Sequence, residues 1–282
     1  MPARRKKVPV TSTLPVAGLP SAIRDATAAQ PDLPLHAGLP AGDWTGCADL
    51  LGGDRLAAWA ERAAGWLRDE YGEAPARVVA GYVVGWYLTV PAKTGALLFR
   101  TARRVPLLGP ADLAVRFDPE APCPSAVAVL RDEFACLPTD PAAGLPAARP
   151  VSGERALAAV LRERYAEHAT AFLRVFTAVD TPALGRHRLG RRALWAWATD
   201  ALDGACWRVG QSVGDEAGGA RDAALVLPAG IAPLTSASTV RPDPRAGGWT
   251  RRRESCCFHY VLERGMGTCA TCPRVCTQQI HS

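Results

Sequence analysis

Hydrophobic residues recur at helical spacing through the middle of the chain, and the pattern changes character at only a few points. A first apolar face runs from Asp54, which we expect to cap the helix, to about Tyr71. Pro75 opens a second segment, and residues 78–92 within it form an uncharged, mostly apolar run. This run is shorter than the roughly 20 apolar residues that span a bilayer, and it contains Pro91. It therefore predicts a buried helix and no stable insertion in a membrane.

Two further helices are predicted after a short region with a different pattern. Residues 105–118 indicate two short strands around a Gly-Pro turn. Ser152 is the expected N-cap of a long helix that ends before residue 181, and another apolar face covers about residues 188–210. Residues 214–250 mix glycine, proline and apolar pieces without a clear period. The predicted fold class is mainly α with a minor β element (α+β).

The composition is typical of a folded protein, and the charge is concentrated near the two ends. With 282 residues, 48% hydrophobic and 21% charged, the chain can bury a core and is not disordered as a whole. The formal charge is +6, but residues 4–7 are all basic, and residues 241–282 hold seven arginines against three acidic residues. The body between them is slightly acidic. This distribution does not favour a broad nucleic-acid surface, and we expect no nucleic-acid partner.

Composition divides the chain into three regions. Residues 1–42, rich in proline and small residues, predict a loosely ordered basic arm; residues 43–245 a mainly helical body; and residues 246–282 a cysteine-rich segment. Pro9 and Pro15 interrupt the stretch after the first basic residues, which is not typical of an export signal. We therefore expect a cytoplasmic protein. In that reducing compartment clustered thiols more often bind metal than form disulfides.

Five of the nine cysteines lie within 21 consecutive residues near the C-terminus: Cys256, Cys257, Cys269, Cys272 and Cys276. A Cys-x-x-Cys turn brings two thiolates to one metal, and two pairs can supply the four thiolates of tetrahedral zinc or of an iron–sulfur cluster. Here the first pair is adjacent, and adjacent side chains of an extended backbone point to opposite sides. This geometry favours a larger acceptor, such as [2Fe–2S], over a single zinc ion, and leaves both open. Cys276 could replace one of the other four.

Cys256-Cys257, a spacer, and Cys269-Ala-Thr-Cys272 together resemble the C-terminal signature of the FhuF-like ferric-siderophore reductases. The resemblance covers about residues 249–276 and implies a [2Fe–2S] cluster held by Cys256, Cys257, Cys269 and Cys272 in a small hairpin beside a helical body. The spacer has eleven residues, one more than the family spacing, and glycines within it could absorb the difference in a turn. Cys276 is additional to the family pattern.

The resemblance also implies a function, that of an oxidoreductase. The cluster would pass one electron to Fe³⁺ held in a siderophore, the substrate, and iron would leave as Fe²⁺, which oxygen ligands bind less tightly. No catalytic residue beyond the cluster is needed. The chain has no Gly-x-Gly-x-x-Gly or P-loop signature, so electrons would come from a separate ferredoxin or reductase. The alternative function is a non-catalytic ligand-binding or regulatory protein with a structural four-cysteine zinc site.

Aromatic and basic residues of the body are candidates for contacts with a bulky anionic chelate, although most tryptophans at helical spacing are ordinary core. His259, two residues after Cys257, is a candidate for a hydrogen bond near the cluster. The substrate-binding candidates are Trp44, Trp86, Trp195, Trp197, Trp207, Trp249, Arg186, Arg188, Arg191 and Arg192. The scattered cysteines, to which we assign no role, are Cys47, Cys123, Cys136 and Cys206.

Overall fold

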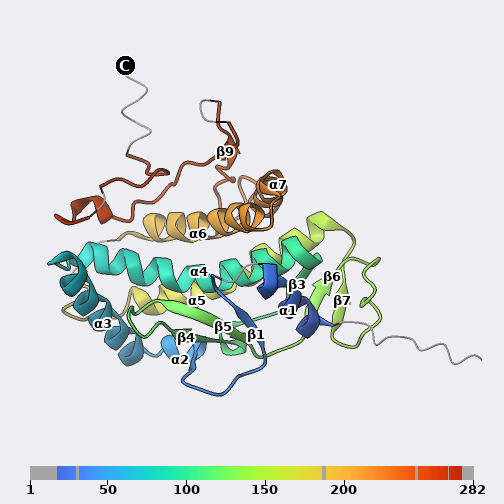
Figure 1. Ribbon diagram of the computed structural model, residues 1–282, viewed down its shortest axis with the longest axis horizontal. Coiled ribbons are helices and arrows are strands. Elements are labelled where there is room, and N and C mark those ends of the chain that lie inside the picture. The colour runs from blue at the N-terminus through green and yellow to red at the C-terminus, as the bar shows by residue number, and fades with distance from the viewer. Residues whose placement is uncertain (1–17, 30–31, 186–188, 245–246, 266, 275–282) are drawn as a thin grey trace, which may run out of the picture.

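The computed structural model describes residues 18–29, 32–185, 189–244, 247–265 and 267–274 (Figure 1). The fold is built around one long central helix, and the other long helices pack against it. The long helices are α3 (Gly53–Tyr71), α4 (Ala76–Ala102), α5 (Glu154–Phe176) and α6 (Arg191–Ser212). In Figure 1, α4 is central, and α6 lies between α4 and the C-terminal segment.

α4 is buried around most of its circumference because its sequence is apolar on every face. Val79, Val83, Tyr87 and Leu98 are at most 1% exposed. Pro91 removes one backbone donor from the helix interior, yet the helix continues to Ala102, because packing on all sides supports it. In the described part of the chain, no helix has both the length and the apolar character needed to cross a bilayer.

A four-stranded sheet lies on the side of α4 opposite to α6 (Figure 1). Its strand order is β1-β5-β4-β2; β1 runs parallel to β5, and the other pairs are antiparallel. A second sheet has the order β3-β6-β7, and β8 and β9 form a separate antiparallel pair. The strands are β1 (Leu35–Ala37), β2 (Thr45–Gly46), β3 (Arg104–Pro106), β4 (Leu113–Phe117), β5 (Pro124–Val129), β6 (Phe134–Cys136), β7 (Ala148–Pro150), β8 (Arg241–Pro242) and β9 (Trp249–Thr250). The short helices are α1 (Leu19–Ala29), α2 (Cys47–Leu50), α7 (Glu216–Val226), η1 (Pro110–Asp112) and η2 (His259–Val261).

The predicted fold class, mainly α with a minor β element, is confirmed, and the long helices lie where the apolar periodicity places them. Pro75 is the N-cap of α4, as expected. The two other predicted caps are wrong: α3 is capped by Gly52 instead of Asp54, and α5 by Gly153 instead of Ser152, and neither glycine has a side chain to bond with. Both helices therefore begin at a glycine without a side-chain cap, and their stability comes from their buried faces.

Three expectations about irregular regions are corrected. Within the predicted loose arm, α1 and β1 are ordered, and Leu19, Ile23 and Leu35 are at most 3% exposed, because their few apolar side chains fill the edge of the core. Residues 1–17 lie outside the described residues. The two strands predicted within 105–118 exist as β3 and β4 but belong to different sheets. α7 forms within the stretch for which no period was found, and Gly219 on α7 and Gly210 on α6 allow the two helices to approach closely.

Candidate metal centre

The segment that begins at Trp249 runs along the side of α6 away from α4 (Figure 1), and at Cys257 and His259 it reaches α4 itself. Apart from β9 and η2, its described residues form no helix or strand. An irregular backbone must find partners for its polar groups outside itself. Side chains of α6 supply several of them, and these contacts fix the cysteines in place.

Asp200 on α6 anchors the backbone immediately before the first cysteine pair. Its carboxylate accepts hydrogen bonds from the backbone N–H groups of Glu254 (3.0 Å) and Ser255 (2.8 Å) and from the Ser255 hydroxyl. The guanidinium of Arg253 lies 3.6 Å from the same carboxylate. Asp200 is 3% exposed, so a charged group has been buried, and four polar contacts compensate for its lost hydration.

Asp203, one turn further along α6, holds a second part of the same region. It accepts hydrogen bonds from the Ser238 hydroxyl (2.6 Å) and from the Thr239 hydroxyl (2.9 Å). Arg251 lies 3.6 Å from it and donates to the Asp200 backbone carbonyl at 2.7 Å. A Cβ at Gly204 would lie 2.8 Å from the Arg251 guanidinium, so only glycine leaves room for this buried arginine.

Glycines on α4 allow the cysteine pair and α6 to approach the central helix. A Cβ at Gly81 would lie 3.1 Å from the backbone oxygen of Cys257 and 3.2 Å from the ring of Trp197. A Cβ at Gly85 would lie 3.1 Å from the same ring. The Arg253 guanidinium covers the ring at 5.2 Å from its centroid. The Trp197 ring thus lies between α4 and the C-terminal segment, and the Arg253 guanidinium lies over it as a cation–π partner.

The two cysteine pairs are joined through backbone hydrogen bonds. The Cys272 N–H donates to the Cys269 carbonyl at 2.9 Å and closes the Cys-x-x-Cys turn, while the Arg253 N–H donates to the Thr271 carbonyl at 3.1 Å and ties that turn to the strand before the first pair. The Phe258 N–H donates to the Cys256 sulfur at 3.4 Å. Phe258 has a φ of 60°, so the chain turns sharply directly after the adjacent cysteines. Phe258 is also the N-cap of η2, which follows the turn.

The four thiols form one electrostatic group. Burial raises the pKa of Cys256, and the neighbouring Cys257 and Cys272 raise it further. Burial also raises the pKa of Cys269, again with contributions from Cys257 and Cys272, while Arg253 offsets part of the rise. Cys272 is 2% exposed, Cys256 and Cys257 are half-buried, and Cys269 is exposed. The group therefore reaches from the protein interior to the surface.

This donor set fits an iron–sulfur cluster. Four thiols from two pairs are the usual ligands of [2Fe–2S], and soft sulfur donors suit its iron. Among the described residues, no set of three or more His, Cys, Asp or Glu side chains is arranged around the position of a single metal ion. Binding to four thiolates would place negative charge beside Arg251 and Arg253. Cys276, the additional cysteine of the sequence pattern, lies outside the described residues.

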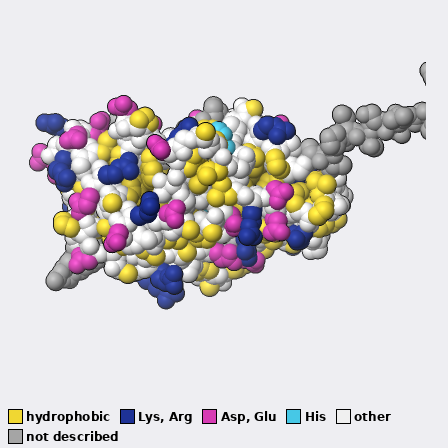
Figure 2. All heavy atoms as spheres, turned by 90° about the horizontal axis from the view of Figure 1, so that it is seen from below, with side chains coloured by type: hydrophobic (Ala, Val, Ile, Leu, Met, Phe, Trp, Pro, Cys, Tyr) yellow, Lys and Arg dark blue, Asp and Glu magenta, His cyan; other side chains and the backbone are white. Residues whose placement is uncertain are grey.

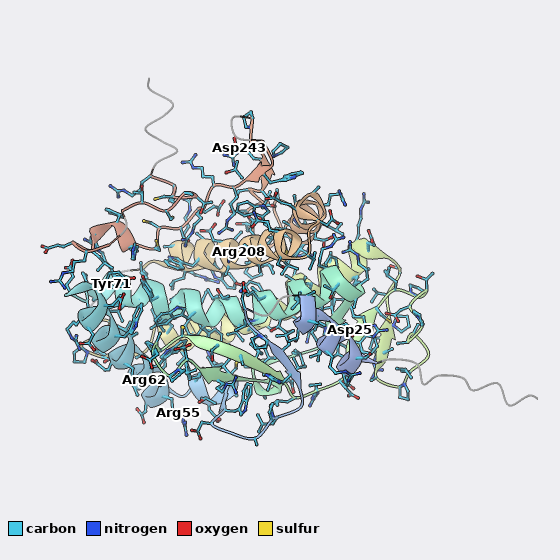
Figure 3. The ribbon with its side chains drawn as sticks, in the orientation of Figure 1. Asp25, Arg55, Arg62, Tyr71, Arg208 and Asp243 are labelled. Carbon is cyan, nitrogen blue, oxygen red and sulfur yellow. The ribbon has the colours of Figure 1, made fainter. Side chains whose placement is uncertain are left out.

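Positive charge is crowded along this face of α6. Arg208, which is also on α6 (Figure 3), reaches the surface, and its pKa is lowered to about 10 by partial desolvation first and then by Arg251 and Arg253. Burial likewise lowers the pKa of Arg251, and Asp200 and Asp203 oppose that effect. Cations are thus gathered where a negatively charged group would be most strongly stabilised.

An aromatic cluster supports the chain just after the cysteine pair. The Tyr82 hydroxyl and the Nδ1 atom of His259 are 2.9 Å apart, and the rings of Tyr71 and His259 meet edge to face at 5.3 Å. Tyr71 lies at the end of α3, below η2 (Figure 3). Burial, and then Tyr71, raises the pKa of Tyr82. His259 therefore bonds beside the cysteines, as its position in the sequence indicated, and its described partner is a tyrosine.

A groove of about 1220 Å³ lies beside the cysteine segment. Its walls come from the start of α6, from the loop at residues 233–239 and from residues 252–254. Pro273, next to Cys272, also lines it, so the groove extends to the second cysteine pair. Four arginines and one glutamate line it: Arg191, Arg192, Arg252, Arg253 and Glu254.

The structure brings some of the sequence-predicted candidates to this groove and places others elsewhere. Arg191, Arg192 and Trp195 line it, whereas Trp197 faces α4 on the opposite side of α6. Arg186 and Arg188 lie outside the described residues. The other tryptophan candidates contact residues of the body or β9: Trp44 under Arg116, Trp86 stacked with Trp59, Trp207 bonded to Glu216, and Trp249 in β9. Cys47, Cys123, Cys136 and Cys206 are free thiols in the body.

Sequence reasoning missed Asp200, Asp203 and Gly81. A signal for the two aspartates was present, because they lie three residues apart within the otherwise uncharged, mostly apolar stretch of residues 193–207. Carboxylates are rarely buried without partners, so such a pair indicates cations or backbone donors from another segment. Which segment supplies them is not visible in the sequence.

Comparison with known proteins identifies a domain at the cysteine-rich segment. Residues 253–274 match the family model described as the FhuF 2Fe-2S C-terminal domain. All four predicted ligand positions, Cys256, Cys257, Cys269 and Cys272, fall within the match. No curated protein matches the chain. A [2Fe–2S] cofactor therefore replaces the structural zinc alternative, and the C-terminal segment of this chain is a 2Fe–2S domain of the FhuF type.

Proposed function

We propose that this iron–sulfur protein is a ferric-siderophore reductase, and that Cys256, Cys257, Cys269 and Cys272 hold its cluster. When bound, the cluster supplies one electron to chelated Fe³⁺, and Fe²⁺ is released because hard oxygen ligands hold it less tightly. The observation that carries the proposal is the match of residues 253–274 to the FhuF 2Fe-2S domain.

Two structural features support an electron-transfer role. Cys269 is exposed, so one side of the cysteine group is within reach of a partner molecule. The arginine-lined groove adjoins the other end of the same segment, through Arg253 and Pro273. A substrate in that groove would lie next to the cysteines, and short separation is what electron transfer requires.

The residues of the chain have positioning and electrostatic roles in this proposal. Asp200 fixes the backbone before the cysteine pair, and Gly81 lets that pair sit against α4. Arg251 and Arg253 offset the negative charge that four thiolates and an added electron bring, which favours the reduced state. The helical body, residues 43–245, supplies the groove wall. No side chain has to donate or accept a proton.

The remaining parts of the proposal concern the cellular setting. The proposed reaction takes place in the cytoplasm. A separate ferredoxin or reductase supplies the electron, and nucleic acid is not a partner. None of these three expectations is needed for the chemical test that follows.

A single-turnover experiment tests the reduction. The anaerobically purified protein is reduced with dithionite, freed of excess reductant and mixed with a ferric siderophore in the presence of a colorimetric Fe²⁺ chelator. We expect about one Fe²⁺ per cluster, formed as the visible absorption of the oxidised cluster returns. Cluster-free protein is the control. A cluster that stays reduced with every ferric chelate offered, while remaining intact, would contradict the proposed function.

A further inference from the structure

The groove beside the cysteines gathers several arginines that have no ion pair. Arg191, Arg192 and Arg252 are exposed, and none of the three makes an ion pair within the described part of the chain. Elsewhere, several arginines are paired with carboxylates, for example Arg100, Arg104 and Arg131, and others, such as Arg155 and Arg174, are exposed without an ion pair among the described residues. What distinguishes the groove is that three such cations line one hollow.

The face opposite to the C-terminal segment shows the contrast. Figure 2 views the molecule from below, and there Lys and Arg side chains are interspersed with Asp and Glu. Mixed charge of this kind creates no strong field of one sign. In the groove, four arginines face one exposed carboxylate, that of Glu254. Positive potential is therefore concentrated at the site that adjoins the cysteines.

The groove is also large and has more than charge to offer. At about 1220 Å³ it exceeds the roughly 300–1,000 Å³ of ordinary small-molecule pockets. The half-buried ring of Trp195 gives it a flat aromatic wall, and the hydroxyl groups of Thr235 and Ser236 lie on the other side. A bulky chelate with aromatic rings and exposed anionic oxygens matches this combination.

Ferric chelates differ in charge according to their ligand class. Three hydroxamates, each singly charged, neutralise Fe³⁺, whereas three doubly charged catecholates leave a trianion. Only the second class gains from uncompensated arginines, and that gain weakens with salt because exposed charges are screened. Catecholate rings can in addition lie against an indole or a guanidinium group.

We infer that the groove formed by Arg191, Arg192, Trp195 and Arg252 selects anionic ferric chelates of the tricatecholate class over neutral trihydroxamates. This inference rests on the proposed function for its biological sense. The binding preference, however, follows from the groove alone and can be measured without any electron transfer.

Gallium complexes provide the test, because Ga³⁺ resembles Fe³⁺ in charge and size but is not reduced under these conditions. Calorimetry with the cluster-loaded protein compares a Ga³⁺ tricatecholate with a Ga³⁺ trihydroxamate at low and at high salt. We expect the tricatecholate to bind at least about tenfold more tightly at low salt, and the ratio to fall as salt rises. Equal affinities for the two complexes would overturn the inference.

A pair of double variants assigns the preference to the groove. Arg191→Gln with Arg192→Gln is expected to weaken tricatecholate binding about tenfold and to leave trihydroxamate binding within about twofold. The matched control is Arg155→Gln with Arg174→Gln, two exposed arginines of α5 with the same loss of charge. A control that weakens binding as much as the groove variant would show a net-charge effect and refute the groove as the site.

The inference and the proposed function can fail separately. If the Ga³⁺ tricatecholate binds preferentially but no ferric chelate is reduced, the groove stands and the reductase proposal falls. If ferric trihydroxamate is reduced and its Ga³⁺ analogue binds as well as the tricatecholate, the reductase proposal stands and the selectivity falls.

Discussion

On α4 and α5, Tyr87 and Phe172 stack at 4.2 Å inside an apolar core, whereas the cysteine segment is fixed to α6 by the carboxylates of Asp200 and Asp203. The first kind of contact is spread over dozens of side chains and depends mainly on buried area. The second depends on a few atoms in defined positions. The body can therefore fold from its hydrophobic pattern, while the segment needs a scaffold that is already in place.

This difference has a consequence for the cofactor. A cluster ligated by an irregular segment must be held by contacts that do not come from that segment's own secondary structure. Here α6 provides hydrogen-bond acceptors and α4 provides space at Gly81. The comparison predicts that changes in the segment affect the cluster first, changes on α6 affect attachment of the segment, and changes in the body affect global stability.

Replacing the buried ligand has the largest expected effect. Cys272→Ser removes a thiolate at a position that is 2% exposed, and a serine oxygen is a poor substitute for sulfur on iron. We expect iron and sulfide to fall from about two each per chain to well below one, with loss of the visible absorption. Chemical analysis and anaerobic spectroscopy provide the measurement, and the body is expected to stay folded.

Two cysteine controls sharpen this result. Cys123→Ser changes a half-buried thiol of the body and is expected to leave the cluster intact. Cys276→Ser changes the additional cysteine of the sequence pattern and is also expected to leave it intact. Loss of the cluster in Cys276→Ser, with retention in Cys272→Ser, would show that the ligand set is wrong.

Removing the carboxylate of Asp200 tests whether α6 attaches the segment. Asp200→Ala leaves the N–H groups of Glu254 and Ser255 without their acceptor and leaves the Arg253 guanidinium without the carboxylate beside it. Breaking such a buried charged contact costs about 3 kcal/mol. Since opening of the segment is then easier, tryptic cleavage at Arg252 and Arg253 is expected to be roughly a hundredfold faster.

Asp200→Asn and Asp25→Ala are the controls for this experiment. The amide keeps one oxygen acceptor and should give an intermediate rate. Asp25 is an exposed residue on α1 (Figure 3), far from the segment in the chain, and its loss should change nothing. If Asp200→Ala is cleaved at the wild-type rate, the segment is not held by α6 as described.

The same contrast explains what could be predicted from the sequence. The long helices were foreseeable because burial of one face imposes a period on the residues, and Leu56, Trp59 and Ala63 of α3 show it directly. The [2Fe–2S] cofactor was foreseeable because its chemistry requires cysteines at short spacing. The pairing of β1 with β5 could not be foreseen, because it joins residues about 90 positions apart and no local pattern specifies it.

The attachment of the segment was not foreseeable for a related reason. Asp200 contacts a backbone more than 50 residues away, and backbone N–H groups are the same in every sequence. Gly81 likewise becomes informative only when Cys257 and Trp197 are seen against it. Local patterns predict elements and local chemistry, whereas contacts between remote irregular segments require the fold itself.

A buried histidine offers a pH test confined to the body. Burial lowers the pKa of His168 to about 4 from its ordinary value of 6.5, with the opposing charge of Asp112 too weak to restore it. The unfolded chain therefore binds the extra proton at higher pH than the folded chain does. The neutral, buried His168 therefore makes its full contribution to stability above about pH 6.5. As the pH falls, this contribution is lost, and the free energy of unfolding has decreased by about 2 kcal/mol at pH 5.

His168→Gln removes this titration while keeping a polar side chain. Urea unfolding of cluster-free protein at pH 7.5 and pH 5 is expected to show a smaller loss of stability in the variant, whatever its stability at pH 7.5. Carboxylates with lowered pKa, such as Asp140, contribute equally to both proteins and cancel in the difference. Identical losses in the two proteins would show that His168 is not buried as a neutral group.

Two glycines give the smallest effects, and their signs should be opposite. Gly65 in α3 has no atom within 4 Å of an added Cβ, so Gly65→Ala gains helix propensity and is expected to stabilise the protein by about 0.5–1 kcal/mol. At Gly81 the same methyl group would meet the Cys257 carbonyl oxygen at 3.1 Å and Trp197 at 3.2 Å. The resulting strain exceeds the gain in propensity and leaves a net loss of about 1 kcal/mol. Urea unfolding measures both changes.

The visible spectrum of the loaded protein separates the two variants. Because only Gly81→Ala displaces the backbone of a proposed cluster ligand, it alone should also shift that spectrum. A shift of equal size in Gly65→Ala would mean that the cluster responds to the stability of the whole body instead of the local contact with α4.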